Sequence, residues 1–460
     1  MQRVKQTEQS ITEGAIWKQL LWFFFPILLG TFFQQLYNTI DAIIVGQFVG
    51  KEALAAVGGA TGTFINLLVG FFVGLSSGAT VIISQYYGGN HEEETSQAVH
   101  TAIALGLVSG VILMVIGLIV SPLALRAMGT PEDIMKPATT YIQVYFAGII
   151  FTLIYNIGSS ILRAVGDAKR PLYYLIVCCF ANLILDLLFV IVFDMGVLGV
   201  AIATLLAQAI SAVLVLLALI RTSECYRLYI KKIRLTGWLL RDIIRIGLPA
   251  GLQSVMYSVS NVLIQSSVNT FGTNTIAAWT AYGKIDALFW MIMGAFGVSA
   301  TTFSGQNFGA QKYDRIRKSV RICLIGAAAV SVLLSTFLYF FGPYIYLLFT
   351  DDPAVIEQGM EILKIFCPFF ITYICVEILS GAIRGTGDSF IPMILTALGI
   401  CGLRIVWILL VVPAFPTIQT VALSYPVTWM VTSALFIVYY LHGGWLRRRI
   451  IQLGLQPENK

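Results

Sequence analysis

Four carboxylic acids lie inside long apolar stretches of this sequence: Asp41, Asp186, Asp286 and Glu377. A carboxylate removed from water is costly, so such a residue is expected to have a cation, a proton or a polar partner beside it. Gln34, Asn38 and Asp41 recur at the spacing of one helix face, and so do Asn182 and Asp186. These two oxygen-rich faces are candidate sites for a cation or a proton.

The residue types are compatible with two ions, Na⁺ and H⁺. Hard cations such as Na⁺ prefer several oxygen ligands, and two carboxylates with an amide and a hydroxyl oxygen would supply them. Burial and a neighbouring carboxylate also favour the protonated form of an acid, so the same residues could carry H⁺.

A second polar stripe, Gln253, Tyr257 and Asn261, repeats the first one later in the chain, with no carboxylate at the place of Asp41. Glu377 and Arg404 are opposite charges in apolar surroundings. The sequence leaves open whether they pair or whether Glu377 contacts a cationic ligand or a proton. Aromatic faces attract organic cations, although packing and interface belts use aromatic residues as well. We expect the following residues to line a ligand cavity: Gln34, Tyr37, Asn38, Gln253, Tyr257, Asn261, Tyr282, Glu377 and Arg404.

The elements that position these residues are predicted to be membrane-spanning helices. Hydrophobic residues make up 58% of the chain and charged residues 11%, too few to cover a water-facing surface. Residues 53–90 and 103–125 contain no Lys, Arg, Asp, Glu or His, and about 20 apolar residues are enough to cross a bilayer. The sequence therefore predicts an all-α integral membrane protein, with spans near 17–43, 54–84, 98–121, 138–161, 171–193, 197–220, 243–270, 277–303, 320–341, 357–382, 391–413 and 420–441.

Basic residues set the predicted orientation. Most of the 29 Lys and Arg residues fall in the segments that are cytoplasmic if the amino terminus is inside. We therefore predict a multi-pass protein of the cytoplasmic membrane with both termini cytoplasmic. The net charge of +6 is attributed to these loops and not to nucleic-acid binding.

Three motifs occur twice, in the same order, at an offset near 221 residues. The pairs are FPILLGTFFQQLYN (25–38) with LPAGLQSVMYSVSN (248–261), SQYYGGN (84–90) with SGQNFGAQ (304–311), and LRAVGDAKRP (162–171) with IRGTGDSFIP (383–392). Both copies of the last motif fall on the predicted cytoplasmic side, so the halves have like orientation. The predicted organisation is a cytoplasmic segment (1–16), an amino-terminal lobe (17–220), a cytoplasmic linker (221–242), a carboxy-terminal lobe (243–441) and a cytoplasmic tail (442–460).

These motifs, with the run YNTIDAIIVGQFVGKEALAAVG (37–58), resemble the multidrug and toxic compound extrusion family over residues 15–440. The resemblance implies twelve helices in two six-helix lobes that form a V-shaped cleft, and antiport of organic, often cationic, compounds against Na⁺ or H⁺. It also implies a cation site in the amino-terminal lobe, at Asp41, Asn182, Asp186 and Thr204. Some family members carry an acid on the seventh helix, where this chain has Gln253 and Asn261.

We thus expect a secondary antiporter for small organic cations or drugs that acts as a monomer in the lipid bilayer and uses no cofactor beyond its coupling ion. The alternative is a flippase or exporter of a lipid-linked or polysaccharide precursor, which would need a basic cavity. Only Lys284 and Arg404 are candidates for that charge. No metalloprotease, nucleophile-elbow or P-loop motif indicates an enzyme.

Overall fold

The structure is a computed structural model that describes residues 11–452, apart from the side chains of residues 51 and 60. The described chain is helical, without β-strands. Its α-helices are α1 (Ile16–Ile44), α2 (Lys51–Gly58), α3 (Ala60–Gly88), α4 (Glu92–Ala127), α5 (Glu132–Ala147), α6 (Ile149–Ala164), α7 (Lys169–Asp186), α8 (Gly196–Arg221), α9 (Gly237–Val268), α10 (Thr273–Gly309), α11 (Tyr313–Tyr346), α12 (Pro353–Phe366), α13 (Phe370–Gly385), α14 (Phe390–Thr396), α15 (Leu403–Val406), α16 (Val412–Ala414), α17 (Ile418–His442) and α18 (Trp445–Gln452).

Short irregular helices join several of these elements. Four are π-helical, namely Val45–Val49, Leu187–Val192, Ala397–Gly402 and Trp407–Val411, and three are 3₁₀-helical, namely Ile230–Lys232, Asn269–Phe271 and Cys367–Phe369. The first two π-helical segments begin four residues after Asp41 and immediately after Asp186. Such segments often occur at functional sites, because they break the regular hydrogen-bond ladder of a helix.

Every predicted span falls on one helix or on consecutive helices. Within the described residues, ten helices are long and apolar enough to cross a membrane, and the pair α5 and α6, bent by 48°, makes an eleventh. The remaining predicted span, 243–270, lies on α9, which does not reach that apolarity. Its first turns carry Arg241, Asp242 and Arg245, and its second half carries the predicted polar stripe.

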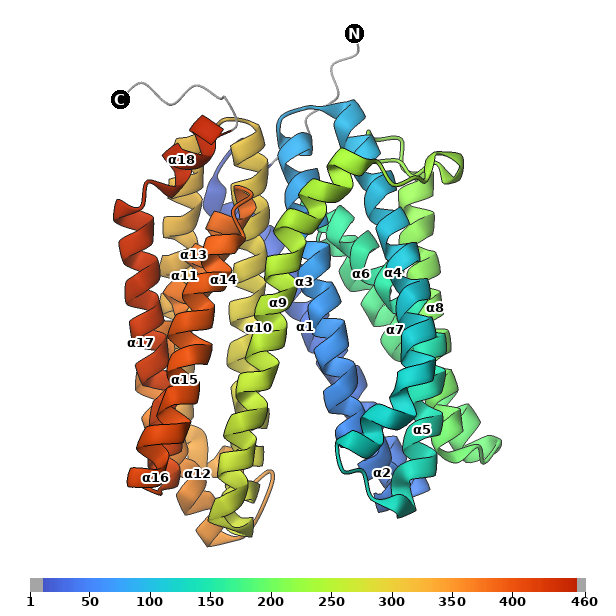
Figure 1. Cartoon of the computed structure of the whole chain (residues 1–460), viewed down its shortest axis with the longest axis vertical. Helices are drawn as coiled ribbons and strands as arrows, with labels where there is room; N and C mark the ends of the chain where they lie inside the picture. The colour runs from blue at the N-terminus through green and yellow to red at the C-terminus, as the bar shows by residue number, and fades with distance from the viewer. Residues whose placement is uncertain (1–10, 453–460) are drawn as a thin grey trace. The chain divides into compact units, whose positions relative to one another are not determined.

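The helices form two compact units (Figure 1). The amino unit is Trp22–Gly251, and the carboxy unit combines Met1–Leu21 with Leu252–Lys460. Both α1 and α9 therefore begin in one unit and end in the other. Part of the predicted amino-terminal segment, residues 1–10, and part of the predicted tail, residues 453–460, lie outside the described residues.

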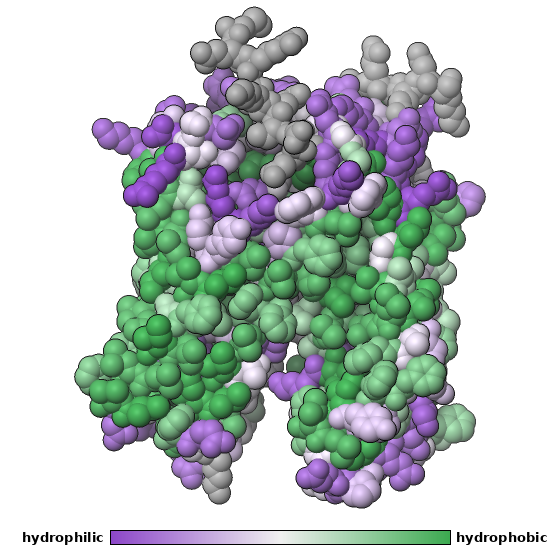
Figure 2. Space-filling model, turned by 180° about the vertical axis from the view of Figure 1, so that it is seen from behind, coloured by the Kyte–Doolittle hydropathy of each residue, from purple (hydrophilic) through white to green (hydrophobic). Residues whose placement is uncertain are grey.

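Outer surfaces of both units are apolar over most of their length. On the face in Figure 2 the middle of each unit is hydrophobic, and hydrophilic residues gather toward the ends. Large apolar side chains such as Ile119 on α4 and Leu333 on α11 are 73% and 70% exposed. Only a lipid environment makes such exposure favourable over so many helices, so the chain is a multi-pass membrane protein.

Glycines bring two helices of the amino unit into backbone contact. Gly74 and Gly78 on α3 face Gly247 and Gly251 at the start of α9, and each pair has the spacing of a small-xxx-small motif. A methyl group on Gly251 would lie 2.7 Å from the Phe71 carbonyl oxygen. Since lipid tails provide no hydrophobic drive for helix association, this close approach is a main source of packing energy here.

The segment between α8 and α9 is fixed to the amino-terminal part of α4. The Tyr229 backbone N–H donates to Nε2 of buried His100 at 2.9 Å, and the two rings stack. Farther along, the Thr236 N–H donates to the Thr101 hydroxyl at 3.4 Å. The predicted cytoplasmic linker is therefore docked against the amino unit by side chains of α4.

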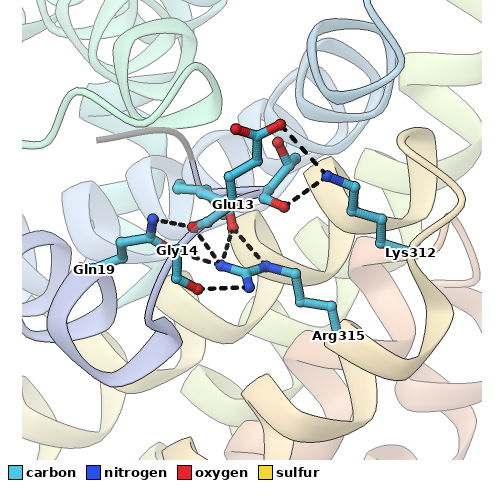
Figure 3. Close-up of polar contacts among 7 residues, drawn as sticks. Glu13, Gly14, Gln19, Lys312 and Arg315 are labelled. Carbon is cyan, nitrogen blue, oxygen red and sulfur yellow. Dashed lines mark hydrogen bonds and ion pairs between the residues drawn. The ribbon is translucent and has the colours of Figure 1, made fainter. Parts of the chain in front are cut away.

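In the carboxy unit, α10 packs against α11, α12 and α13, and α13 against α17 (Figure 1). Phe289, Phe370 and Trp429 form the centre of this packing, with the Phe289 and Phe370 rings stacked at 4.2 Å. The segment before α1 also belongs to this unit. Arg315 on α11 donates to the backbone carbonyls of Ile11, Glu13 and Gly14 at 2.7–3.2 Å (Figure 3).

We predict that Gly78→Ala destabilises the protein, because the added methyl group would collide with the Ile243 carbonyl oxygen and the Gly247 backbone. The matched control is Gly294→Ala on α10, where a Cβ meets nothing within 4 Å. Alanine is the better helix former by about 1 kcal/mol, so the control should keep or raise the unfolding temperature. Thermal unfolding of purified protein checks this, and equal midpoints for the two variants would contradict it.

Candidate cation site

The candidate cation site lies in the amino unit, where three helices meet. Asp41 stands near the end of α1, Asn182 and Asp186 stand in the last turns of α7, and Thr204 is on α8. The four side chains are between 0% and 7% exposed. Asp186, Thr204 and Asn182 are the polar groups that interact with Asp41, so the structure brings the whole predicted set together.

Most polar atoms of these four side chains make no direct hydrogen bond to any residue that the structure describes. They are Oδ1 of Asp41, both carboxylate oxygens of Asp186, both polar atoms of the Asn182 amide and the Thr204 hydroxyl oxygen, and all of them are buried. None of the ion pairs of the described residues includes either acid. Two neighbouring buried carboxylates without a counter-ion are strongly unfavourable, because each charge loses its hydration and repels the other. The arrangement therefore favours uptake of a positive charge.

The donor set fits either of the two ions predicted from the sequence. Two carboxylates, an amide oxygen and a hydroxyl oxygen are the ligand types that hard cations prefer. The same geometry holds two acids close enough to share a proton. Within the described residues, no three or more His, Cys, Asp or Glu side chains cluster in a way that could hold a metal ion.

Two tyrosines border the site. Tyr37, predicted from the sequence, lies one helical turn before Asp41 and interacts with it. Tyr141 on α5 was not predicted; it is buried and interacts with both Asp41 and Thr204. No periodic polar pattern surrounds Tyr141 in the sequence, so its place in the site depends on how α5 packs. These phenol groups add oxygen atoms close to the four predicted ligands.

The other predicted residues of α1 lie away from this cluster. Gln34 and Asn38 are exposed, and Gln34 lines a separate cavity of the amino unit with residues of α6 and α7. Gln34, Asn38 and Asp41 therefore share one face of α1, but only Asp41 lies in the acidic cluster.

In the carboxy unit, Tyr257 and Glu377 belong to a hydrogen-bonded chain through Tyr373, and Gln253 makes separate hydrogen bonds. The Tyr257 and Tyr373 hydroxyls are 3.4 Å apart, and Tyr373 donates to Glu377 at 3.1 Å. Gln253 accepts a hydrogen bond from Arg384 at 3.1 Å and donates to Thr396 at 3.0 Å. Asn261 is exposed and lies outside this chain.

Glu377 and Arg404 do not pair with each other. Glu377 interacts with Arg384, one of the two arginines of the repeated motif. Arg404 lies over the Tyr425 ring at 4.0 Å and donates to the Thr428 hydroxyl at 3.4 Å. Of the two alternatives that the sequence left open, a Glu377–Arg404 ion pair does not occur among the described residues.

Tyr282 belongs to an aromatic cluster around a further acid. Its ring is 4.5 Å from that of Phe366, and it interacts with buried Asp286 one turn away. Trp290 donates its indole N–H to Asp286 at 2.5 Å. Lys284, two residues from this acid, is exposed and lies on another face. Asp286 is thus held among aromatic rings, and it forms no ion pair with a basic residue in the part of the chain that the structure describes.

Comparison with known proteins places this chain among transporters. The MatE family model matches residues 26–188 and 249–410. The chain is 27% identical over 455 residues to the probable multidrug resistance protein YoeA of Bacillus subtilis, covering 97% of each chain. It is 29% identical over 439 residues to the probable multidrug resistance protein YpnP of the same organism, covering 95% of this chain and 97% of the relative. A MOP superfamily transporter from Pyrococcus furiosus has the same fold, with a TM-score of 0.87, 23% identity and coverage of 98% and 100%.

We predict that Asp41→Asn raises the apparent unfolding temperature by roughly 3 °C or more at pH 8 without Na⁺. The change removes one of two like charges that are buried without a counter-ion. The matched control is Glu132→Gln, an exposed acid in the same unit, which should shift the midpoint by less than about 1 °C. Thermal unfolding in detergent measures both, and an equal or lower midpoint for Asp41→Asn would contradict the like-charge interpretation.

Proposed function

The chain belongs to the MatE family of multidrug and toxic compound extrusion transporters, and from this premise we propose that it is a secondary active antiporter for multidrug efflux. It exports organic, often cationic or amphipathic, compounds in exchange for Na⁺ or H⁺ by alternating access of its two lobes. Its relatives named as multidrug resistance proteins over nearly their whole length support this function. The single observation that carries the coupling role is the unpartnered, buried pair Asp41 and Asp186.

Coupling follows from the charge of that pair. With both acids ionised the site is unfavourable, so Na⁺ or H⁺ entering from outside, where it is more abundant, neutralises it. Asp41 is on α1, which carries Pro26 in its interior and ends in a π-helical segment. Both features weaken the backbone ladder, so α1 can change its curvature when the charge at Asp41 changes. Substrate affinity and ion occupancy are thereby linked through one helix.

Organic cations find complementary chemistry in the carboxy unit. The Trp279 ring lies 5.9 Å from the Tyr282 ring and 6.1 Å from the Tyr425 ring. Tyr425 is also 5.0 Å from Phe366, and Tyr282 interacts with the buried carboxylate of Asp286. Aromatic faces and a carboxylate together attract a desolvated organic cation. In the proposed cycle the substrate is released outside when the ion binds, and a new substrate is taken up after the ion leaves to the cytoplasm.

The proposed setting is the cytoplasmic membrane, with both termini cytoplasmic and the monomer as the functional form. The mechanism needs no cofactor other than the coupling ion and no nucleic acid. Export of a lipid-linked or polysaccharide precursor is not favoured, since the relatives over the full chain are named for multidrug resistance.

Efflux of ethidium from cells or proteoliposomes, with a Na⁺ gradient and a pH gradient imposed separately, tests the proposal. We expect one gradient to drive efflux, and Asp41→Asn to reduce the rate at least about tenfold, because the site then lacks one of its charges. Glu132→Gln should retain the wild-type rate. Full efflux by correctly inserted Asp41→Asn protein would exclude the assigned role of this residue.

Thr204→Val distinguishes the two ions. Valine has the shape of threonine without the hydroxyl oxygen, so a Na⁺ site loses a ligand whereas a carboxylate proton site keeps both acids. If Na⁺ is the coupling ion, the Na⁺ concentration for half-maximal efflux should rise roughly several-fold, because the site has lost one oxygen ligand. If H⁺ is the coupling ion, the pH profile of efflux should change little.

A further inference from the structure

A small polar cavity lies within the amino unit, apart from the acidic cluster. Its volume is about 60 Å³, and it lies between α1, α6 and α7. Its polar lining comes from Thr31 and Gln34 on α1 and from Tyr155, Asn156 and Arg163 on α6. One water needs roughly 10–15 Å³ of such volume, so the cavity admits a small polar group as well as water.

Arg163 is the only charged residue of that lining, and no acid among the described residues forms an ion pair with it. Its one hydrogen bond within the described residues goes to the Ser160 hydroxyl at 3.4 Å, although a guanidinium has five N–H donors. None of the ion pairs of the described residues includes it. A half-buried arginine with most of its donors free is an arrangement that favours an anion.

The internal repeat identifies the negative charge that Arg163 lacks. Arg163 aligns with Arg384, and at the same offset Asn156 aligns with Glu377. In the carboxy unit, Glu377 supplies a negative charge to Arg384, which also donates to Gln253 and Ser380. In the amino unit the aligned position is the neutral Asn156, whose amide donates to the Thr152 carbonyl at 2.9 Å. The carboxy unit therefore carries an internal counter-ion for its arginine. In the amino unit the aligned residue is neutral, so a bound ligand could supply the negative charge.

We propose that this cavity binds the carboxylate of an amphipathic organic compound, with Arg163 as its counter-ion and the amides of Asn156 and Gln34 beside it. One guanidinium matches the single charge and the planar, two-oxygen geometry of a carboxylate. The assignment deepens the proposed export function, and rests on it for the statement that the anion is part of an exported compound.

Binding of radiolabelled benzoate to the purified full-length protein in nanodiscs tests this site without any ion gradient. The decisive comparison is Asn156→Glu with Asn156→Gln, because the two new side chains have the same shape and differ in charge. Glutamate at this position reproduces the charge arrangement of the carboxy unit and neutralises Arg163 internally. We expect it to bind benzoate at least about tenfold more weakly than the glutamine variant, the size of a lost charge-assisted hydrogen bond.

Two further variants complete the experiment. Arg163→Gln should lose benzoate binding as Asn156→Glu does. Arg170→Gln, which removes the same charge from an exposed residue paired with Asp167 outside the cavity, should bind like the wild type.

Equal binding by the two Asn156 variants would overturn the proposal, and so would displacement of benzoate by benzamide or by chloride at equal concentration. Because the assay uses no gradient, failure here leaves the antiport proposal standing. Likewise, failure of gradient-driven efflux would leave a positive binding result intact.

Discussion

The membrane-spanning helices of this protein hold backbone polar groups and several charged side chains away from water. The free-energy cost of losing their hydration is the constraint on which the rest of the structure depends. Backbone groups meet the constraint by forming helices throughout the described chain. Side-chain charges meet it by gathering at few positions, each with a specific neighbour. Arg404 lies over Tyr425, Arg384 donates to Gln253, and Trp290 donates to Asp286. A charge without such a neighbour therefore indicates a place for an ion or a ligand.

The two halves follow one plan but balance charge differently. In the carboxy unit, Glu377, Tyr373 and Tyr257 form a hydrogen-bonded chain, and Arg384 has Gln253, Ser380 and the negative charge of Glu377. In the amino unit, Asp41 and Asp186 lie beside each other, and neither they nor Arg163 form an ion pair with any described residue. The internal repeat places Asn156 where the carboxy unit has Glu377, so among the described residues Arg163 lacks the acidic neighbour that Arg384 has.

Helix α1 connects features that belong to different units. The segment before it and its first residues, through Leu21, belong to the carboxy unit, where Arg315 holds the backbone of residues 11–14. Beyond Trp22 the helix belongs to the amino unit, passes Pro26 and reaches Asp41. A change of charge at one end of this helix is thus covalently linked to a docked segment at the other, which is a physical basis for coupling.

The sequence by itself determined the membrane class, the positions of the spans, the internal repeat and the helix faces that carry Asp41, Asn182 and Asp186. These features are local, because apolar length and residue spacing define a span and a face. The tertiary structure alone decided which faces meet. It placed Tyr141 beside Asp41, gave Glu377 and Arg404 different partners, and left Arg163 without an acid. Helix periodicity fixes the direction of a side chain, but its partner depends on the packing of other helices.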